Sequence, residues 1–469
     1  MEWESIPTVV LLKIYGLLPG PDRLSASATC RNWRCPVFQV PLIKHLNLSL
    51  KNDTDPERIH FLIDMFFWKL ESLKLEVDPS VEYCLELAQQ VLTSLEDSPK
   101  LHTLKIRFSD NSLVRNCFHP RNIDQDSVVH RILIYRNLIS PLLAVMNTKN
   151  CLETFSFPLV NKLASYSDRL YTSLAENTRH WYTISNLFLA TLRITFPDNA
   201  VQENTLQLDQ LLDPNFGIRR FAFLQMLSID HDVLTDEVLA TIGMNNVVGG
   251  LKKMTIVAIK PNMFVTNAGW SYFVAQNPEC KIRLTLIGSE VTMDQGSNLI
   301  MRAMPITHFR ALYCRGLRMA CLNSLIRWNE NTLEHLELVN ENVIWMNSIL
   351  EGVPEEEETE FLDPVIFAAW RCQHLRVIKI SYRYFGESLI GIARLRGPKL
   401  FELDIPKSQI VYNSMTQLSQ EISKALGRPW KASENSFKRT PTLQKILKKS
   451  MQCIEADEAD RQHLARPSA

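Results

Sequence analysis

Apolar residues recur along most of the chain in a spacing that alternates between that of a strand and that of a helix. The strand-like segments follow the pattern apolar-x-x-apolar-x-apolar, whose last positions share one face of an extended chain. Copies of this pattern begin at Ile43, Leu70, Leu101, Leu152, Leu189, Leu224, Leu251, Ile306, Leu333, Leu375 and Leu400, with a degenerate copy at Leu284. Helical stretches precede several copies, for example residues 55–70, 81–95, 269–277 and 318–329. A strand and a helix at spacings such as 27 residues, from 43 to 70, predict an α/β solenoid with parallel strands on the inner wall and helices outside.

The predicted repeats are irregular. Their period lies in the range of leucine-rich repeats, which usually place Asn or Cys eight residues after the first apolar position. Here that position holds Asp78, Asp232, Cys314, Pro197, Ile259 and Arg383 in different copies. The long gap from 101 to 152 predicts an extra helix around Val128–Met146. The acidic segment EGVPEEEETEF predicts a solvated loop near 351–362, because it combines like charges with proline and has no apolar period.

The first forty residues follow a different pattern. Helical spacing runs from Thr8 to Leu18, but the apolar residues cover most of the circumference of this helix, whereas a surface helix normally shows one apolar stripe. The sequence Pro-Gly-Pro at 19–21 ends it, and two further short helices are predicted over 22–28 and 30–38. Three short helices cannot bury enough surface to fold securely alone. The surplus apolar face therefore needs a neighbour, either the rest of the chain or another protein.

These N-terminal residues resemble an F-box, the motif that docks on the Skp adaptor of cullin ubiquitin ligases. The resemblance rests on Ile6-Pro7, LLKIYGLLP, DRLSASATCRNW and the closing Trp33, with Ile6 where the family usually has Leu. The alternative is an ordinary helical cap on the solenoid. The resemblance implies an adaptor interface within residues 5–38, with apolar anchors. The residues that match the F-box pattern are Ile6, Pro7, Leu11, Ile14, Leu18, Leu24 and Trp33.

Scattered blocks of the C-terminal half resemble the F-box only protein 33 group. They are GWSYFVAQNPECKI, DPVIFAAWRCQHLRVIKI, LIGIARLRGPKL and LGRPWKA. What this resemblance implies is a substrate-recognition subunit of an SCF-type ubiquitin ligase, with the Skp adaptor, a cullin and a target protein as partners, in the cytoplasm or nucleus. A scaffold that uses the F-box and repeats only for assembly is the main alternative. A hydrolase with an unrecognised site is a distant one.

The predicted organisation has three parts: an F-box at 1–40, an irregular leucine-rich-repeat solenoid at 41–430 and a charged tail at 431–469. The tail loses the repeat and predicts one amphipathic helix from Thr442 to Ile454, which would cap the last repeat or bind a partner. Capping is the safer interpretation, because the apolar end of a solenoid must be covered.

Composition excludes several classes of function. Lys and Arg number 51, as do Asp and Glu, so no net charge favours nucleic acid or a membrane surface. No stretch offers the roughly 18 apolar residues of a membrane span, and the acidic start of the chain argues against a secretory leader. The ten scattered cysteines indicate reduced thiols.

Motifs of catalysis, cofactor binding and metal binding are not found. The nearest candidate, GESLIG at 386–391, is one residue too long for a hydrolase nucleophile elbow, and Ser388 is predicted to begin a helix. Cys314 and Cys321 lack a second close ligand pair for zinc. We therefore expect a non-catalytic protein with no cofactor and no metal.

The strand pattern also predicts where a target protein would bind. The residue just after each apolar triad points away from the core, toward the inner wall. In four consecutive later repeats this residue is apolar, and such side chains would align into an exposed stripe, which is typical of an interaction site. The alternatives are that another segment covers the stripe, or that the register slips by one residue. The candidate target-binding residues are Val257, Ile287, Arg310, Leu312 and Val339.

Overall fold

The computed structural model divides the chain into two compact units. The first comprises residues 1–158 and 162–187, and the second comprises 159–161 and 188–469. The residues that the structure describes are 6–18, 20–37, 44–78, 81–96, 98–108, 133–149, 151–156, 186–188, 223–231, 234–244, 250–258, 265–287, 299–312, 314, 319–339 and 363–434.

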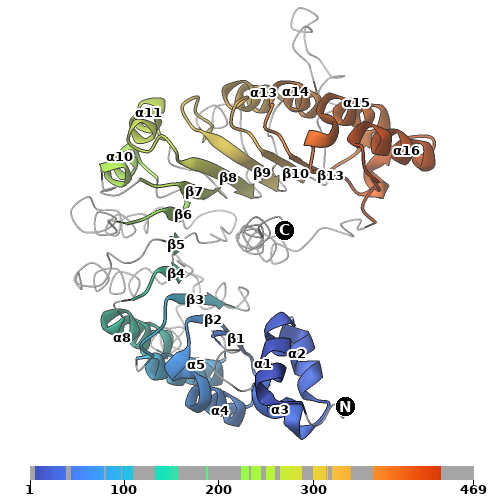
Figure 1. Ribbon diagram of the computed structural model, residues 1–469. Coiled ribbons are helices and arrows are strands. Elements are labelled where there is room, and N and C mark those ends of the chain that lie inside the picture. The colour runs from blue at the N-terminus through green and yellow to red at the C-terminus, as the bar shows by residue number, and fades with distance from the viewer. Residues whose placement is uncertain are drawn as a thin grey trace, which may run out of the picture. The chain divides into compact units, whose positions relative to one another are not determined.

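The chain begins with three short helices, α1 (Thr8–Leu17), α2 (Gly20–Ser27) and α3 (Arg31–Val37). They form one cluster in which α3 contacts both α1 and α2 (Figure 1). Pro7 precedes the first turn of α1, where the backbone N–H that proline lacks would have no helical partner. The three predicted helices are thus confirmed, with shifts of one or two residues at their ends.

The first unit continues with parallel strands in the order β1-β2-β3-β4. Its elements are β1 (His45–Leu50), α4 (Pro56–Phe66), the 3-10 turn η3 (Phe67–Lys69), β2 (Ser72–Val77), α5 (Glu82–Leu95), β3 (Thr103–Phe108), the π-helical η4 (Tyr135–Ile139), α8 (Ser140–Thr148) and β4 (Thr154–Ser156). The helices lie on one side of the strands (Figure 1). The segments η4 and α8 overlap the predicted extra helix at 128–146 and extend two residues beyond it.

The second unit repeats this arrangement, with parallel strands in the order β6-β7-β8-β9-β10-β11-β13. Its elements are β6 (Met226–Asp230), α10 (Asp236–Met244), β7 (Lys253–Ala258), α11 (Asn267–Gln276), β8 (Lys281–Ile287), β9 (Ile306–Leu312), α13 (Met319–Trp328), β10 (His335–Val339), α14 (Pro364–Arg371), β11 (Val377–Ser381), β12 (Tyr384–Phe385), α15 (Gly386–Arg396), η11 (Gly397–Lys399), β13 (Glu402–Asp404), η12 (Lys407–Gln409), β14 (Ile410–Val411) and α16 (Met415–Leu426). Strands β12 and β14 pair separately. Strand β5 (Asn186–Phe188) spans the boundary between the units in sequence.

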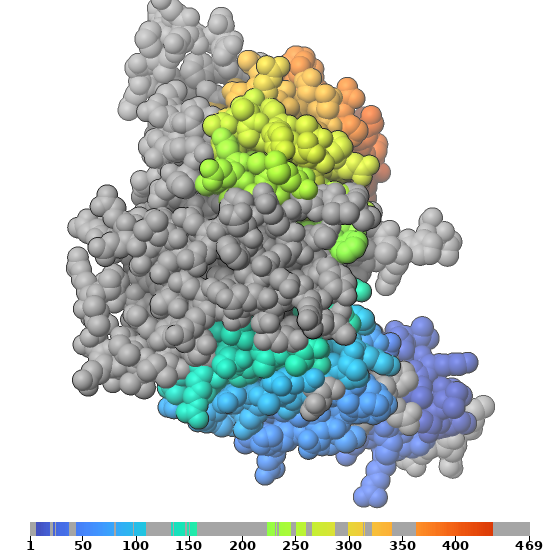
Figure 2. Space-filling view, turned by 90° about the vertical axis from the view of Figure 1, so that its left-hand side faces the viewer, coloured from blue at the N-terminus to red at the C-terminus, as the bar shows by residue number. Residues whose placement is uncertain are grey.

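The core of each unit lies between the strands and the helices. In β2 the side chains alternate, and Leu73, Leu75 and Val77 are fully buried while the intervening residues are partly exposed. Burying one Leu or Ile side chain contributes about 1.5–3 kcal/mol, so every repeat adds its own increment. On the outer surface, α5 with α8 and α10 with α11 form close-packed surfaces (blue to teal and green, Figure 2). The predicted solenoid of parallel strands and outer helices is confirmed.

Neighbouring repeats are joined by a buried polar side chain at the end of a helix. Asn277 accepts a hydrogen bond from the backbone N–H of Leu251 in the preceding repeat (2.8 Å), and Asn329 accepts one from the N–H of Ile306 (2.7 Å). The amide nitrogen of each asparagine donates to the carbonyl four residues earlier in its own helix. One side chain therefore satisfies backbone groups of two repeats at once. We call this contact the helix-end bridge.

The helix-end bridge recurs with other residue types that donate to backbone carbonyls. These contacts are Ser98 Oγ to Leu70 O (3.4 Å), Lys149 Nζ to Ser98 O (2.7 Å), Arg396 Nη2 to Leu375 O (3.2 Å) and Arg428 Nη2 to Leu400 O (2.5 Å). The bridging position thus precedes the strand. It differs from the position eight residues into the repeat at which the sequence pattern predicts a polar side chain.

Some expectations fall outside the described residues. They concern the acidic loop near 351–362 and the helix at 442–454. The predicted limits of the three domains stay a prediction. Within the described part of the chain, each helix is too short or too polar to cross a membrane.

Replacing the bridging asparagine should destabilise the second unit. Asn329→Ala leaves the buried N–H of Ile306 without its acceptor, which costs on the order of 2 kcal/mol. Urea unfolding followed by circular dichroism measures the loss. Asn413→Ala, at an exposed position, is the matched control and should leave the unfolding midpoint in place. Equal midpoints for both variants would contradict the helix-end bridge.

Candidate functional site

The three N-terminal helices have a small core of their own. Leu11 and Tyr15 of α1 are fully buried, and Ile6, Ile14, Leu18, Ala26 and Trp33 pack around them while remaining partly exposed. The rings of Tyr15 and Trp33 meet edge to face with their centroids 6.0 Å apart. These contacts lie on one side of α1.

Polar contacts tie α1 to the other two helices. The hydroxyl of Tyr15 donates to the Trp33 carbonyl (2.6 Å), and the amide of Asn32 donates to the Ile6 carbonyl (2.9 Å). Arg23 in α2 donates to the Leu18 carbonyl at the end of α1 (2.7 Å). Both ends of α1 are therefore held by side chains from its neighbours.

The opposite side of α1 is apolar and exposed. Val9, Val10 and Leu17 are 67%, 45% and 88% exposed. At about 100° per residue, these three side chains fall within one arc of about 100°, with Lys13 inside it and Leu11 and Tyr15 on the far side. We call Val9, Val10 and Leu17 the exposed arc of α1. An exposed apolar face of this kind marks a site of interaction.

The residues of the predicted adaptor-binding set differ in how far they are exposed. Leu11 belongs to the core of the three helices, where its side chain is fully buried. Ile6, Ile14, Leu18 and Trp33 are partly exposed and Pro7 is exposed, while the side chain of Leu24 lies outside the described residues. The exposed arc is not among the adaptor-binding residues predicted from the sequence. An even apolar pattern does not show which side of α1 faces inward.

The predicted exposed stripe on the strand face is wrong for the positions that the structure describes. Val257, Leu312 and Val339 are only 4%, 1% and 4% exposed, so they form no open apolar surface. The side chain of Ile287 lies outside the described residues. Arg310 is on this face and is largely buried, with 13% of its side chain exposed.

The register of the strands also differs from the predicted alignment. Leu312 pairs with Ile287 and Val339, as expected, but Val257 pairs with Thr285, which in turn pairs with Arg310. The repeat that begins at Leu251 is thus displaced by two residues. A displacement of two keeps every side chain on its face, because side chains alternate with a period of two. The displacement brings Val257 into register with Arg310, through Thr285 of the strand between them.

A cluster of charged and aromatic polar groups lies on the strand face of the second unit. Arg310 Nε is 3.1 Å from Glu337 Oε2, and His335 Nε2 is 3.4 Å from the same oxygen. The rings of His308 and His335 stack at a centroid distance of 5.4 Å. Glu337 has 6% of its side chain exposed. We call Arg310, Glu337, His335 and His308 the strand-face cluster.

Burial and charge set the protonation of this cluster. Burial by itself would raise the pKa of Glu337, but the hydrogen bond with His335 and the charge of Arg310 outweigh it and lower the pKa to about 2. Burial lowers the pKa of His335, and Glu337 does not offset that effect. Burial and the nearby charge of Arg283 place the pKa of His308 far below its usual range. At neutral pH the cluster therefore holds an ionised carboxylate and two neutral imidazoles.

The described residues contain no group of three or more His, Cys, Asp or Glu side chains that could hold a metal ion. The strand-face cluster pairs its carboxylate with an arginine. The exposed arc of α1 is open to a partner, whereas the strand-face cluster is largely buried.

Comparison with known proteins agrees with the N-terminal architecture. Residues 3–49 match the F-box-like family model, which spans α1 to α3 and most of β1. The chain thus carries an F-box-like domain, which is followed by a solenoid of stacked parallel strand and helix repeats. The resemblance in the N-terminal sequence is thus confirmed.

The chain is similar over most of its length to F-box only protein 33. It is 23% identical to the Homo sapiens protein over 492 residues, which cover 91% of this chain and 82% of that protein. A shorter segment is 31% identical to F-box/LRR-repeat protein 21 of Bos taurus over 124 residues, or 24% of this chain and 28% of that protein. Among solved structures, the Rad7 and Elc1 complex of yeast matches with a TM-score of 0.40 and 13% identity, covering 87% of this chain and 89% of that one.

Truncating the buried anchor of α1 should unfold the F-box helices. Leu11→Ala removes a fully buried side chain and is expected to cost about 2–5 kcal/mol. Leu17→Ala, at a position 88% exposed on the same helix, is the matched control and should leave stability nearly unchanged. Hydrogen exchange of the amides in residues 8–37 measures both effects. Equal protection in the two variants would contradict the assignment of Leu11 to the core.

The strand-face cluster should make the second unit sensitive to acid. An imidazole whose pKa is lowered by folding stabilises the native state fully above its unfolded value of 6.5, and this contribution is lost as the pH falls below it. We expect the melting temperature to fall between pH 7 and pH 5. His335→Gln should reduce the pH dependence of the free energy of unfolding by up to about 1.4 kcal/mol per pH unit. Exposed His60→Gln is the matched control. A pH profile unchanged by His335→Gln would refute the neutral, buried state of His335.

Proposed function

We propose that this F-box protein is the substrate-recognition subunit of an SCF-type ubiquitin ligase. The F-box helices would dock on the Skp adaptor and, through it, on a cullin, while the repeats present a target protein in the cytoplasm or nucleus. The observation that carries the proposal is the exposed arc of α1, an unpartnered apolar surface on the domain that matches the F-box family model. Apolar interfaces concentrate their energy in a few buried anchors.

The proposed adaptor surface combines two groups of residues. The exposed arc supplies Val9, Val10 and Leu17, and Pro7 precedes it at the start of α1. The second group is Ile6, Ile14, Leu18 and Trp33, which pack against Leu11 and Tyr15 but remain partly exposed. Because Trp33 also packs against Tyr15, a change at Trp33 would weaken the fold and the interface together.

The contribution of such a subunit to the reaction is positioning. Holding a target near a ubiquitin-loaded enzyme turns a bimolecular encounter into an effectively unimolecular one, which lowers the entropic cost of transfer. The chain itself then needs no catalytic group, cofactor or metal. Val257, Leu312 and Val339 are not part of the proposed target surface, because their side chains are buried.

A charge placed in the exposed arc should abolish adaptor capture without unfolding the chain. Leu17→Asp combined with Val10→Asp is expected to cost on the order of 2 kcal/mol or more of binding, because the carboxylates would be buried against an apolar partner. Met244→Asp, at an exposed apolar position of α10 (61% exposed), is the matched control. Titration of each full-length variant with purified Skp adaptor measures the affinities. Unchanged affinity in the double variant would refute the proposed interface.

Ubiquitin transfer distinguishes a substrate receptor from a scaffold. The full chain would be assembled with adaptor, cullin and a ubiquitin-loaded enzyme, and ubiquitylation of proteins that co-purify with the chain would be followed. A receptor gives transfer that disappears in the Leu17→Asp, Val10→Asp variant. An assembled complex without transfer would instead favour the scaffold.

A further inference from the structure

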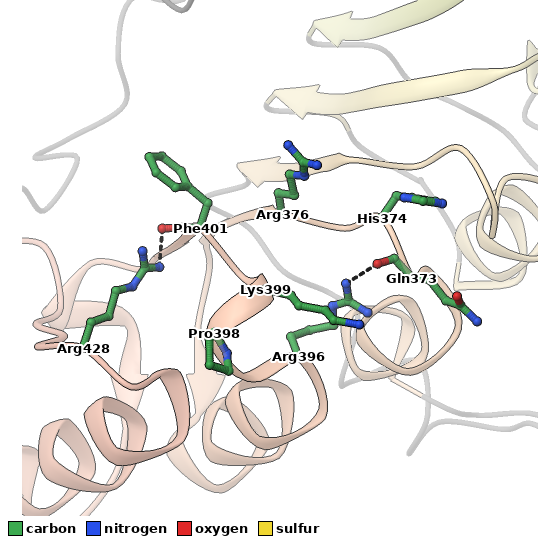
Figure 3. Close-up of a pocket in the computed structure, with 8 residues that line it drawn as sticks. All are labelled: Gln373, His374, Arg376, Arg396, Pro398, Lys399, Phe401 and Arg428. Atoms are coloured by element: carbon green, nitrogen blue, oxygen red, sulfur yellow. Dashed lines mark hydrogen bonds between the residues drawn. The ribbon is translucent and has the colours of Figure 1, made fainter. Parts of the chain in front are cut away.

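A basic pocket lies at the side of the last repeats, where strands β11 and β13 begin. Its volume is about 510 Å³, and the side chains that surround it come from the segments before β11 and β13, the end of α15 with η11, and the segment after α16 (Figure 3). The lining residues are Gln373, His374, Arg376, Arg396, Pro398, Lys399, Phe401 and Arg428. Two C-terminal blocks of the sequence, LIGIARLRGPKL and LGRPWKA, supply four of these residues.

The pocket is strongly cationic. Arg376, Arg396, Lys399 and Arg428 line it together, and no carboxylate is among its lining residues. Nearby acidic groups are already engaged by cations outside the pocket: Glu402 with Lys379 (2.9 Å), Glu421 with Arg394 (3.0 Å) and Glu330 with Arg371 (2.5 Å). Four cations gathered without a counter-charge repel one another, and an anion would remove that repulsion.

Arg396 fixes a largely buried positive charge at the wall of the pocket. Its residue is 8% exposed, and its Nη2 donates to the carbonyls of Gln373 (2.5 Å) and Leu375 (3.2 Å). Its buried Nε has no hydrogen-bond partner. A buried donor without a partner costs about 1–3 kcal/mol, and burial also lowers the pKa of this guanidinium. The guanidinium is therefore held in place by one of its three nitrogens, at the wall of the pocket.

Arg428, like Arg396, donates through one nitrogen to two backbone carbonyls. Its Nη2 donates to the carbonyls of Leu400 and Phe401, and its guanidinium carbon lies 5.7 Å from the centre of the Phe401 ring. These helix-end bridge contacts use one nitrogen of a group that has five N–H donors. Ser98 and Asn329 form the bridge elsewhere with far fewer donors. The bridge alone therefore does not require arginine at these two positions.

We propose that this pocket binds a phosphate monoester. A phosphate dianion matches the charge of several cations better than a single carboxylate does, and the planar fork of arginine suits its oxygens. The exposed side chains of Arg376 and Lys399 would contact the phosphate from the open side, while Arg396 and Arg428 would lie beneath it. Pro398 and the 70% exposed Phe401 offer an apolar wall for the group that carries the phosphate.

The phosphate could be carried by a protein side chain or by a free small molecule. The chemistry of recognition is the same for both, so the experiment must separate them. The pocket lies in the second unit and the F-box helices in the first. Adaptor capture and phosphate binding can therefore fail independently, and each is measured on the same full-length chain.

Calorimetric titration of the full-length chain tests the proposal with three probes. They are glycerol 2-phosphate, a capped pentapeptide with a central phosphoserine, and the same peptide with glutamate in place of phosphoserine. The test variant is Arg376→Gln with Lys399→Gln, because both side chains are exposed and their loss should leave the fold intact. The matched control is Lys424→Gln with Lys431→Gln, which removes two exposed positive charges outside the lining residues.

We expect the phosphorylated probes to bind the wild-type chain and the control alike, and the test variant at least tenfold more weakly. Melting temperatures would verify that all three proteins fold. Binding of the phosphopeptide at least tenfold tighter than glycerol 2-phosphate would assign the phosphate to a protein, and comparable affinities would assign it to a small molecule. Absence of binding by both phosphorylated probes, equal binding of the glutamate peptide, or equal affinity of test and control variants would overturn the proposal.

Discussion

The helix-end bridge is the contact on which the repeats depend. At several points where a helix ends and the next strand begins, a backbone group of the neighbouring repeat would be buried without its partner, and each such group costs about 1–3 kcal/mol. Asn277 and Asn329 supply an acceptor and a donor at once. Lys149 and Arg428 supply only donors, so they contact carbonyls. The residue type can therefore change from repeat to repeat, provided that the backbone group it meets changes with it.

The three F-box helices are also limited by how much apolar surface they can bury. Leu11 and Tyr15 use one side of α1 to build a core, and the hydroxyl of Tyr15 is satisfied by the Trp33 carbonyl. Three short helices have too little surface to bury a second apolar face among themselves. Val9 and Leu17 consequently remain exposed. The surplus hydrophobicity that is visible in the sequence thus corresponds to the exposed arc of α1.

What could be predicted from the sequence follows from the periods of regular structure. The triad at Leu70, Leu73 and Leu75 is fully buried, because an extended segment with that spacing can hide its apolar side chains on only one face. Because side chains alternate with a period of two, the sequence pattern cannot reveal a register displacement of two residues. Val257 was therefore predicted in register with Leu312, but it is in register with Arg310, through Thr285 of the strand between them. The burial of Leu11 was hidden for a similar reason. When apolar residues surround a helix, the sequence does not show which side of it faces the core.

The arginines at 396 and 428 show how a structural contact can also create a binding site. Each guanidinium must stay close to backbone carbonyls to form the helix-end bridge, and this fixes its position before any ligand arrives. Because the guanidinium is already ordered and partly desolvated, little side-chain conformational entropy would be lost when an anion binds. A lysine could form the bridge, as Lys149 does, but its ammonium lacks the planar fork that holds two oxygens. The helix-end bridge alone therefore does not explain why arginine occurs at positions 396 and 428.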